Sequence, residues 1–425
     1  MAERLTAQDA GAHARGVCFK TGPPAQVGLE LEWLVHDLVD PLRAVPPARL
    51  ERAFDGLTGP GAFPGGSRFS LEPGGQVELS SRPGSLSSCT ADIAADTEVL
   101  RAALAAHGLA LAGWGLEPFS PRERILHLPR YEAMEAHFDR GGPWGRRMMR
   151  CTAGLQINLD AGEDRAGAVT DWRRRWELAH RLGPVLVAAF ANSPIWRGRP
   201  TGWRSGRQAV WWRMDATRTR PPSYDPDPRT AWADYALDAT VLCIRCEEPG
   251  SWDAPAGLTF RGWLDGAAPR LRPPTIEDLD YHLTTLFPPV RPRGWLELRM
   301  IDAQHGDEWV VPSAVSTVLF DDPVAAEAAW AATEPLCGDG VVPSEHTWMR
   351  AARFGMSAPE FAKPALECFA AAEKALADSP ETHAAVSAFI ERYVARGRCP
   401  ADDRLDALPG GASPAPREEL QEAWR

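Results

Sequence analysis

Several short segments of the chain alternate polar and apolar residues with the two-residue period of a β-strand. Between Val27 and Trp33, Glu30 and Glu32 fall on one face of such a strand, and the leucines beside them fall on the other. The same spacing pairs Gln76 with Glu78, Gln156 with Asn158, and Glu297 with Arg299. This pattern predicts strands with one apolar face against a core and one polar face that can line a cavity.

The polar faces of these strands have an unusual composition for a hydrated sheet. A hydrated face usually mixes Thr, Lys, Arg and Ser, whereas these faces carry Glu, Gln, Asn and one Arg. Packed carboxylates repel one another unless a cation neutralises them, and their oxygens suit hard cations. We therefore predict a magnesium site formed by Glu30, Glu32, Glu72, Glu78 and Glu297. The alternative interpretation is an ordinary antiparallel sheet with one wet face.

The charge composition limits the partners of the protein. A formal net charge of -11 argues against a broad nucleic-acid surface and against binding to acidic membranes. Lys20, Lys363 and Lys374 are the only lysines, and none stands in a Gly-x-x-x-x-Gly-Lys-Ser/Thr phosphate loop. Any nucleotide would therefore be held by metal ions and arginines.

The cysteines and the apolar runs predict a cytoplasmic protein. Eight cysteines stand at irregular spacing, as in reduced proteins, and Cys243 and Cys246 lie in a segment that we interpret as a structural strand. Residues 1–20 lack the apolar core of a secretion signal. The longest apolar run, over 185–191, is too short to span a bilayer.

A length of 425 residues allows either two or three average domains or one large mixed domain. Helical periodicity is present over 90–107, 171–190, 312–320, 325–333, 361–377 and 383–395, and Pro184 predicts a kink or break in the second helix. Further strands are predicted over 109–114, 148–160, 240–246 and 258–264. Pro-Gly-Gly and Pro-Ala-Pro within 400–425 predict a flexible C-terminal tail.

Several motifs in the same order resemble the glutamate–cysteine ligase family of plants and many bacteria. They are Gly28-Leu-Glu-Leu-Glu32, Ser70-Leu-Glu-Pro-Gly-Gly-Gln-Val-Glu-Leu-Ser80, Cys151-Thr-Ala-Gly-Leu-Gln-Ile-Asn-Leu-Asp160, Ala191-Asn-Ser-Pro194 and the segment Tyr281–Arg299. The resemblance covers about residues 26–325, most of the chain. Arg213–Thr219 and Asp234–Asp238 are most similar to the actinobacterial branch that serves ergothioneine synthesis.

The resemblance implies an α+β fold in which a curved antiparallel sheet forms a funnel-shaped active site with helices packed outside. Residues 1–399 would form a single catalytic domain. The implied reaction uses ATP and two or three Mg²⁺ ions to join the side-chain carboxylate of L-glutamate to the amine of L-cysteine. It passes through a γ-glutamyl phosphate and yields γ-glutamylcysteine. No motif identifies the cysteine pocket.

Site residues follow from the strand faces together with the resemblance. Arg299 and Glu297 are predicted to be catalytic, with Arg299 stabilising charge on the transferred phosphoryl group. The alternative for Arg299 is a salt bridge to a clustered carboxylate. The predicted substrate-binding residues are Gln76, Gln156, Asn158, Arg207, Arg218 and Tyr235. Each of these could instead be an ordinary structural residue, and His282 is interpreted as a buried structural histidine rather than a base.

Other activities would use the same acidic cluster. A ligase with a different amine acceptor would keep the fold and the ATP chemistry. A metal-dependent phosphohydrolase would consume ATP without either amino acid. A non-enzymatic protein would bind divalent ions on the acidic sheet without turnover.

Overall fold

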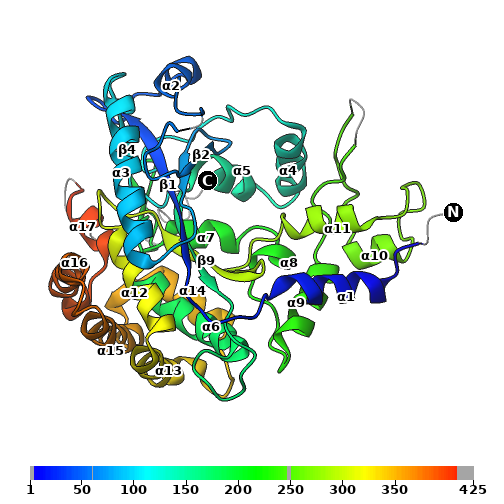
Figure 1. Cartoon of the computed structure of the whole chain (residues 1–425). Coiled ribbons are helices and arrows are strands. Elements are labelled where there is room, and N and C mark those ends of the chain that lie inside the picture. Colours follow the sequence, from blue (N-terminus) through cyan, green and yellow to red (C-terminus); the bar gives the residue numbers. More distant parts are fainter. Residues whose placement is uncertain (1–3, 60, 247–249, 409–425) are drawn as a thin grey trace.

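The computed structural model describes residues 4–59, 61–246 and 250–408, and an antiparallel sheet lies at its centre (Figure 1). The strand order is β2-β3-β1-β5-β9-β8, and β4 pairs with the end of β1. The strands of the sheet are β1 (Val27–Asp37), β2 (Arg68–Leu71), β3 (Val77–Ser80), β4 (Leu109–Ala112), β5 (Gly154–Asp160), β8 (Val290–Pro292) and β9 (Trp295–Asp302). A separate hairpin joins β6 (Ile195–Trp196) to β7 (Arg199–Pro200).

The register of the sheet places the predicted polar residues in one band. Glu32 lies opposite Glu78 on β3, and Glu30 lies opposite Gln156 on β5. Asn158 on β5 then lies opposite Glu297 on β9. Since side chains opposite each other share a face of the sheet, one row of polar groups crosses four strands.

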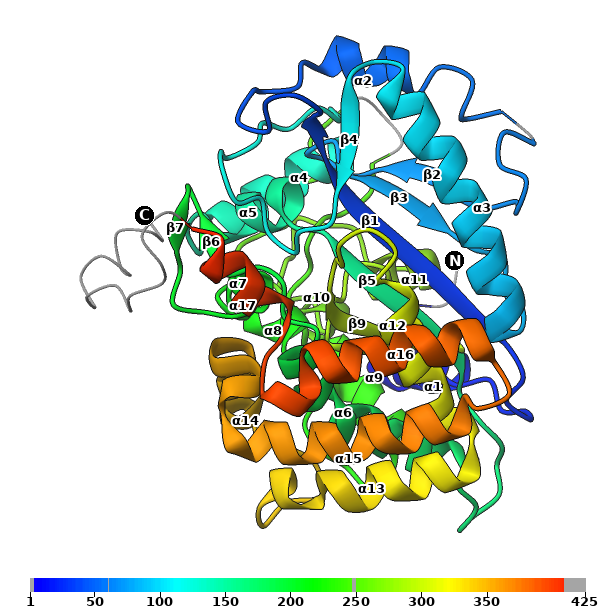
Figure 2. The same ribbon diagram turned by 90° about the vertical axis from the view of Figure 1, so that its left-hand side faces the viewer.

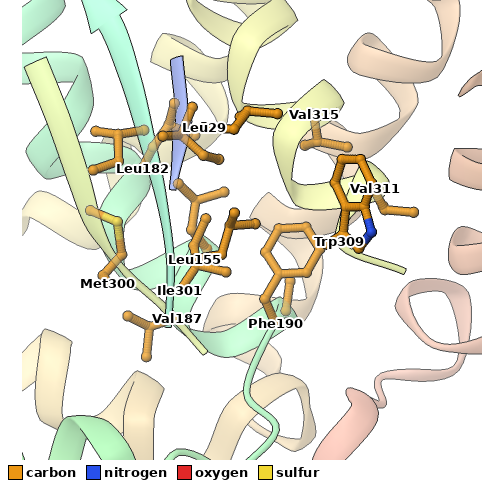
Figure 3. Close-up of a cluster of buried hydrophobic side chains, with 14 of the residues drawn as sticks. Leu29, Leu155, Leu182, Val187, Phe190, Met300, Ile301, Trp309, Val311 and Val315 are labelled. Atoms are coloured by element: carbon orange, nitrogen blue, oxygen red, sulfur yellow. The ribbon is translucent and has the colours of Figure 1, made fainter. Parts of the chain in front are cut away.

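The apolar face of the same strands contributes to the hydrophobic core. Leu29, Leu155 and Ile301, from β1, β5 and β9, are buried together with Leu182 and Val315 of the covering helices (Figure 3). The alternation read from the sequence therefore separates the core from the polar row.

The helices surround the sheet on the side of this core and at both ends. Figures 1 and 2 show α13, α15 and α16 grouped at one end of the molecule, with α6 and α12 between this group and the sheet, α2 at the opposite end, and α4 and α5 beside the sheet in the half of the molecule away from the group. The helices are α1 (Ala7–Cys18), α2 (Pro47–Ala53), α3 (Leu86–Ala105), α4 (Pro129–Asp139), α5 (Trp144–Cys151), α6 (Trp172–Ala189), α7 (Gly206–Trp212), α8 (Ala216–Thr219), α9 (Pro228–Asp238), α10 (Phe260–Leu264), α11 (Ile276–Leu283), α12 (Val310–Asp321), α13 (Pro323–Cys337), α14 (Glu345–Phe354), α15 (Pro359–Ala375), α16 (Pro380–Arg392) and α17 (Pro400–Asp406). The mixed architecture with an antiparallel sheet confirms the predicted class at that level.

Helix α6 is not broken at Pro184. It runs from an N-cap at Asp171, whose side chain accepts the Arg173 and Arg174 amides, through to Ala189. A Cβ on the adjacent Gly183 would lie 1.8 Å from the ring of Trp348 on α14. Close packing of this buried helix against its neighbours stabilises it despite the hydrogen bond that proline removes.

Four other sequence predictions differ from the structure. The predicted strand over 258–264 is helix α10, capped by the Thr259 hydroxyl, and the predicted strand over 240–246 contains only isolated bridges. Residues 148–151 end helix α5, so the strand predicted to begin at 148 begins at Gly154. The predicted tail is ordered at its start, since α17 packs with Ala401 0% exposed, while residues 409–425 lie outside the described part of the chain.

Candidate active site

The polar row of the sheet borders a cavity of about 410 Å³. Helices α4, α5 and α7 and the segment before β8 complete its wall. Eight predicted site residues line it: Glu30, Glu32, Glu72, Gln76, Glu78, Gln156, Arg207 and Arg299. Strands far apart in the sequence thus bring most of the predicted polar residues to one cavity.

Glu72 reaches the cavity from the turn between β2 and β3. The turn is closed by backbone hydrogen bonds from Gly75 to Glu72 and from Glu72 to Gln76, both of 2.9 Å. A Cβ on Gly74 would lie 2.1 Å from the backbone oxygen of Arg150, so the turn approaches α5 as only glycine allows. The Pro73-Gly74-Gly75 turn therefore packs closely against α5 and holds Glu72 at the cavity.

Burial and then the charges of neighbouring carboxylates raise the pKa of three glutamates, Glu30, Glu32 and Glu72. Burial, followed by the charge of Glu78, raises the pKa of Glu32 to about 7. Burial and then the charges of Glu32 and Glu78 raise the pKa of Glu72 to about 8. The pKa of Glu30 is raised by burial, then by Glu297 and Glu78. The site therefore concentrates negative charge that a bound cation would stabilise.

The donor set of the cavity suits magnesium, although the carboxylates do not converge on one point. Within the described part of the chain, no group of three His, Cys, Asp or Glu side chains is close enough to hold a metal ion. The described residues that line the cavity include four glutamates and neither His nor Cys. Mg²⁺ usually binds through one or two carboxylates, waters and substrate phosphates, and a cavity of this size has room for that arrangement.

Gln156 links the carboxylates to the arginines. Its Nε2 donates to Glu32 at 2.7 Å, and its Oε1 accepts from Arg299 NH1 at 2.7 Å. Arg299 also pairs with Glu297, two residues earlier on β9. Burial opposes the charge of Arg299, but Glu297, Glu30 and Glu32 raise its pKa. The salt bridge considered for Arg299 therefore exists, and it places the guanidinium at the cavity wall.

Glu297 lies behind the cavity wall and is 0% exposed. It accepts two hydrogen bonds of 2.8 Å from Arg291 on β8 and also pairs with Arg299. Burial would raise its pKa, but these guanidinium charges lower it to about 2. In this arrangement Glu297 orients two arginines, and its predicted metal role would require Arg299 to turn away.

Two of the predicted amide ligands have their polar groups occupied within the protein. Gln76 accepts from the Gly74 amide at 3.0 Å and donates to the Thr152 carbonyl at 2.8 Å, so it fixes the β2–β3 turn. Asn158 donates to Glu30 at 3.0 Å and accepts from Trp295 Nε1 at 2.8 Å, outside the cavity lining. Both amides position neighbouring groups rather than offering free contacts to a substrate.

Arg207 extends from α7 to the cavity beneath β5. Its NH2 donates to the Arg299 carbonyl at 3.0 Å. A Cβ on Gly154 would lie 2.4 Å from the same NH2, so glycine leaves the space that the guanidinium occupies. Burial lowers the pKa of Arg207, while Asp302 and Glu32 oppose this effect. Arg207 therefore lines the same cavity as the predicted carboxylates.

Arg218 and Tyr235 do not reach this cavity. Arg218 is 0% exposed and donates to Asp215 at 2.8 Å and to the Thr285 carbonyl at 2.9 Å. Tyr235 stacks on Trp232 and lines a different pocket. The structure therefore does not bring these two predicted residues to the cavity, because a sequence rich in Arg and Trp does not show which side chains face inward.

His282 has a structural environment, as the sequence analysis favoured. Its Nε2 lies 2.9 Å from the Ala236 carbonyl in the interior of the α9–α11 region. Burial, followed by the charge of Arg218, lowers its pKa to about 3. A neutral, buried imidazole away from the cavity does not act as its general base.

Sequence reasoning missed several arginines of the cavity wall. They are Arg68, Arg130, Arg291 and Arg293. The hairpin Val290–Leu298 turns at Gly294, which has φ +90°, and this places Arg291 opposite Glu297. The Arg-Gly turn between two strand-like runs was a signal for that pair. Arg130 begins α4 and lies 5.4 Å from the ring of Tyr281, a contact that no local motif indicates.

The finished geometry defines a class of protein. A buried cluster of carboxylates faces six arginines across one cavity on an antiparallel sheet. Carboxylates recruit divalent cations, and arginine forks bind carboxylates and phosphates. A site of this composition has the groups needed to bring polyanionic substrates together with divalent cations, which is a requirement of enzymes of phosphoryl transfer.

Comparison with known proteins gives the family. Glutamate-cysteine ligase family 2 matches residues 26–425, and the chain belongs to this family. It is 41% identical to the glutamate–cysteine ligase EgtA of Mycolicibacterium smegmatis, over 96% of this chain and 92% of the relative. It is 40% identical to EgtA of Mycobacterium tuberculosis, over 93% and 88% of the two chains. These findings confirm the resemblance inferred from the sequence motifs.

More distant relatives include the chloroplastic glutamate–cysteine ligase of Arabidopsis thaliana, which is 30% identical over 75% of this chain and 64% of that protein. Among solved structures, the glutamate–cysteine ligase of Francisella tularensis in complex with AMP is 13% identical. The match has a TM-score of 0.49 and covers 95% of this chain and 92% of the other. In the described part of the chain, no helix has both the length and the hydropathy needed to cross a membrane.

Proposed function

We propose that the protein is an ATP-dependent glutamate–cysteine ligase that forms γ-glutamylcysteine and ADP. The γ-carboxylate of L-glutamate attacks the γ-phosphate of ATP, and the amine of L-cysteine then displaces phosphate from the acyl phosphate. The observation that carries this proposal is the single cavity in which acidic strands face arginines, in a chain of the glutamate–cysteine ligase family.

We assign the negatively charged substrates to the two sides of this cavity. Glu30, Glu32, Glu72 and Glu78 would hold two or three Mg²⁺ ions, because their charges otherwise repel in a buried space. When bound, Mg²⁺ neutralises the phosphates of ATP and lowers the barrier to attack by an anionic carboxylate. Glu297, the fifth carboxylate predicted as a metal ligand, is proposed instead to orient Arg299, with which it pairs.

Arg299 is proposed as the catalytic arginine. Glu297 and Gln156 hold its guanidinium at the cavity wall from two directions. A guanidinium fixed before the reaction stabilises the charge that spreads over the transferred phosphoryl oxygens without having to reorganise. Gln156 also donates a hydrogen bond to Glu32, so the same amide would fix the position of Arg299 relative to a carboxylate that binds an ion.

Arg207 is proposed to bind a substrate carboxylate. It extends from α7 to the cavity lining, and its planar fork matches a carboxylate in shape and charge. Arg207 and Arg299 adjoin, since the carbonyl of Arg299 accepts from Arg207 NH2. An amino acid bound by Arg207 would therefore lie beside the phosphoryl-transfer site, within the predicted funnel.

The setting of the reaction is part of the proposal. All eight cysteines are unpaired in the structure, as expected in a reducing compartment such as the cytoplasm. We propose ergothioneine synthesis as the pathway served, based on the similarity to the EgtA relatives. Deleting the gene should then abolish ergothioneine, and reintroducing the gene or supplying γ-glutamylcysteine should restore it.

The activity is tested by phosphate release from ATP and Mg²⁺, with mass detection of the peptide. Four reactions contain L-glutamate alone, L-cysteine alone, both amino acids, or L-glutamate with another amine. The proposal expects phosphate and γ-glutamylcysteine together only when both amino acids are present. Phosphate release without either amino acid would indicate a phosphohydrolase, and preference for another amine would replace cysteine as the acceptor.

A further inference from the structure

Arg207 is buried without full use of its hydrogen-bond donors. It is 3% exposed, and neither its Nε nor its NH1 has a hydrogen-bond partner in the described part of the chain. An unpaired donor on a buried charged group is costly, and such groups are normally paired. A neighbouring group must therefore compensate the charge and hold the side chain.

That neighbour is Asp302 at the end of β9. Its Oδ1 lies 4.0 Å from Arg207 NH1, which is an ion pair beyond hydrogen-bond distance, and its side chain is 1% exposed. The pair balances charge while Nε and NH1 of Arg207 stay without a hydrogen bond, and NH2 donates to the Arg299 carbonyl. A direct hydrogen bond would instead have used the donor that a ligand needs.

Asp302 also fixes the backbone that carries Arg207. Its Oδ2 accepts from the Asn192 amide at 2.9 Å and from the Ser193 hydroxyl at 2.6 Å, and its Oδ1 accepts from the Ser205 hydroxyl at 2.9 Å. Ser193 Oγ in turn accepts from the backbone amide of Arg207 at 3.0 Å. One buried carboxylate therefore connects β9, the Asn192–Ser193 segment and the start of α7.

The Asn-Ser pair of Ala191-Asn-Ser-Pro194 acquires a physical role from these contacts. Asn192 Nδ2 donates to the carbonyls of Gly113 and Ala303 at 2.8 Å each, which anchors the segment to two further loops. The Ser193 hydroxyl then connects Asp302 to Arg207. The motif lies outside the cavity lining and reaches the cavity through Arg207.

We propose that Asp302 is a positioning residue that acts through Arg207, holding its guanidinium at the cavity wall to bind the carboxylate of an amino-acid substrate. The inference rests on the proposed ligase function. Its physical basis is competition between two carboxylates, because Glu32 is the other acidic group whose charge acts on Arg207. Without the charge of Asp302, Glu32 attracts the guanidinium toward the ion-binding carboxylates.

The test uses Asp302→Asn, Arg207→Lys and the double variant. The asparagine retains an oxygen for Asn192 and Ser193 and can donate to Ser205, so the change removes charge with little change of shape. KM is measured for L-glutamate and L-cysteine in turn, with ATP saturating. We expect Asp302→Asn to raise KM for one amino acid about tenfold, with kcat within about twofold. In the double variant, Asp302→Asn should raise that KM less than about twofold above its value in Arg207→Lys alone.

Asp321→Asn is the matched control. Asp321 is a partly buried carboxylate that pairs with the buried Arg175 at 2.9 Å, away from the cavity lining. The Asp321→Asn change should lower the stability of the protein without changing KM for L-glutamate or KM for L-cysteine. An unchanged KM in Asp302→Asn, or multiplicative effects of the two changes on KM, would overturn the proposal, because a merely structural aspartate would give independent effects.

The test of Asp302 can be told apart from a failure of the ligase assignment and from misfolding of a variant. Thermal shifts induced by L-glutamate or L-cysteine report binding without turnover, so the same comparison holds if the reaction product is another amide. If Asp302→Asn does not fold, Ser193→Ala replaces it in the cycle, since its hydroxyl connects Asp302 to the Arg207 amide. A Ser193→Ala effect on ligand binding that persists unchanged in the Arg207→Lys background would reject the inference.

Discussion

Glu32 and Glu78 lie directly opposite each other on β1 and β3, and both face the active-site cavity. Like charges at directly opposed positions destabilise a sheet. Ser70 and Ser80 each donate to one oxygen of Glu78 at 2.9 Å, and Gly154 and Gln156 donate to Glu32 at 2.7 Å. The fold therefore holds two carboxylates that repel each other in fixed positions. This arrangement favours the binding of a cation at the expense of the stability of the protein.

The first prediction concerns pH and Mg²⁺. Glu72 has a pKa of about 8 in the folded protein against 4.5 for the unperturbed group, so the folded state binds more protons between these values. Stability without divalent cations should therefore decrease as pH rises from about 5 to about 8. Millimolar MgCl₂ should raise Tm more at pH 8 than at pH 5.5. Thermal melts across pH, with and without MgCl₂, provide the measurement.

Glu72→Gln serves as the variant for that experiment. It removes a cavity carboxylate whose pKa is raised to about 8, so the pH dependence of Tm should flatten and the Mg²⁺ effect should weaken. Calcium and sodium chloride at matched ionic strength separate ion binding from screening. A Tm increase with MgCl₂ that is the same at both pH values would contradict the acidic site.

The second prediction compares isosteric changes in two glutamates. Glu297→Gln leaves the buried Arg291 and Arg299 without their carboxylate, which should lower the free energy of unfolding by about 3–5 kcal/mol. Glu72→Gln relieves repulsion and should not destabilise the protein. Both variants should lose most turnover. Urea unfolding measures the difference, and equal stabilities would show that Glu297 does not support the arginines.

The third prediction concerns Arg299→Lys. A point charge replaces a guanidinium fork that contacts Gln156 and Glu297, so stabilisation of the transferred phosphoryl group should weaken. We expect kcat to fall about 100-fold or more, with KM for L-glutamate within about threefold. Arg350→Lys is the control, since Arg350 pairs with Glu360 on the exposed surface. An unchanged kcat in Arg299→Lys would reject the catalytic role.

The strand faces of the site could be predicted because their signal is local. Alternation around Glu30, Gln156 and Glu297 encodes which side chains share a face, and pairing of neighbouring strands then aligns them. The prediction over 258–264 failed for the opposite reason. A short apolar run does not distinguish a strand from a buried helix, and the Thr259 cap decides for the helix.

The arginines could not be assigned in the same way. Arg207 and Arg218 stand in one Arg- and Trp-rich segment, and only tertiary contacts separate their roles. Arg207 reaches the cavity because Gly154, on a distant strand, leaves room for it. Arg218 faces away because Asp215, three residues before it, forms a buried salt bridge with it. The sequence signal for the Asp215–Arg218 salt bridge was the i,i+3 spacing of these opposite charges.

The fourth prediction tests the space beneath β5. Gly154→Ala would place a Cβ 2.4 Å from Arg207 NH2, so the guanidinium must move. We expect KM for one amino acid to rise at least about tenfold while the protein stays folded. Gly16→Ala is the control, because its added Cβ in helix α1 would meet nothing within 4 Å besides its chain neighbours and the backbone of its own helix. Equal KM values in the two variants would exclude a constraint on Arg207.

The last prediction separates the two arginines that the sequence placed together. Arg218→Lys removes a fork that is bonded to Asp215 and to the Thr285 carbonyl in a fully buried position. The unfolding free energy should fall by about 3–5 kcal/mol, whereas KM in the folded protein should stay within about twofold. Arg207→Lys should give the reverse pattern, because two donors of Arg207 lack partners within the described residues. Chemical unfolding and steady-state kinetics on both variants distinguish the roles. A large KM change in Arg218→Lys, without loss of stability, would indicate that Arg218 binds a substrate after all.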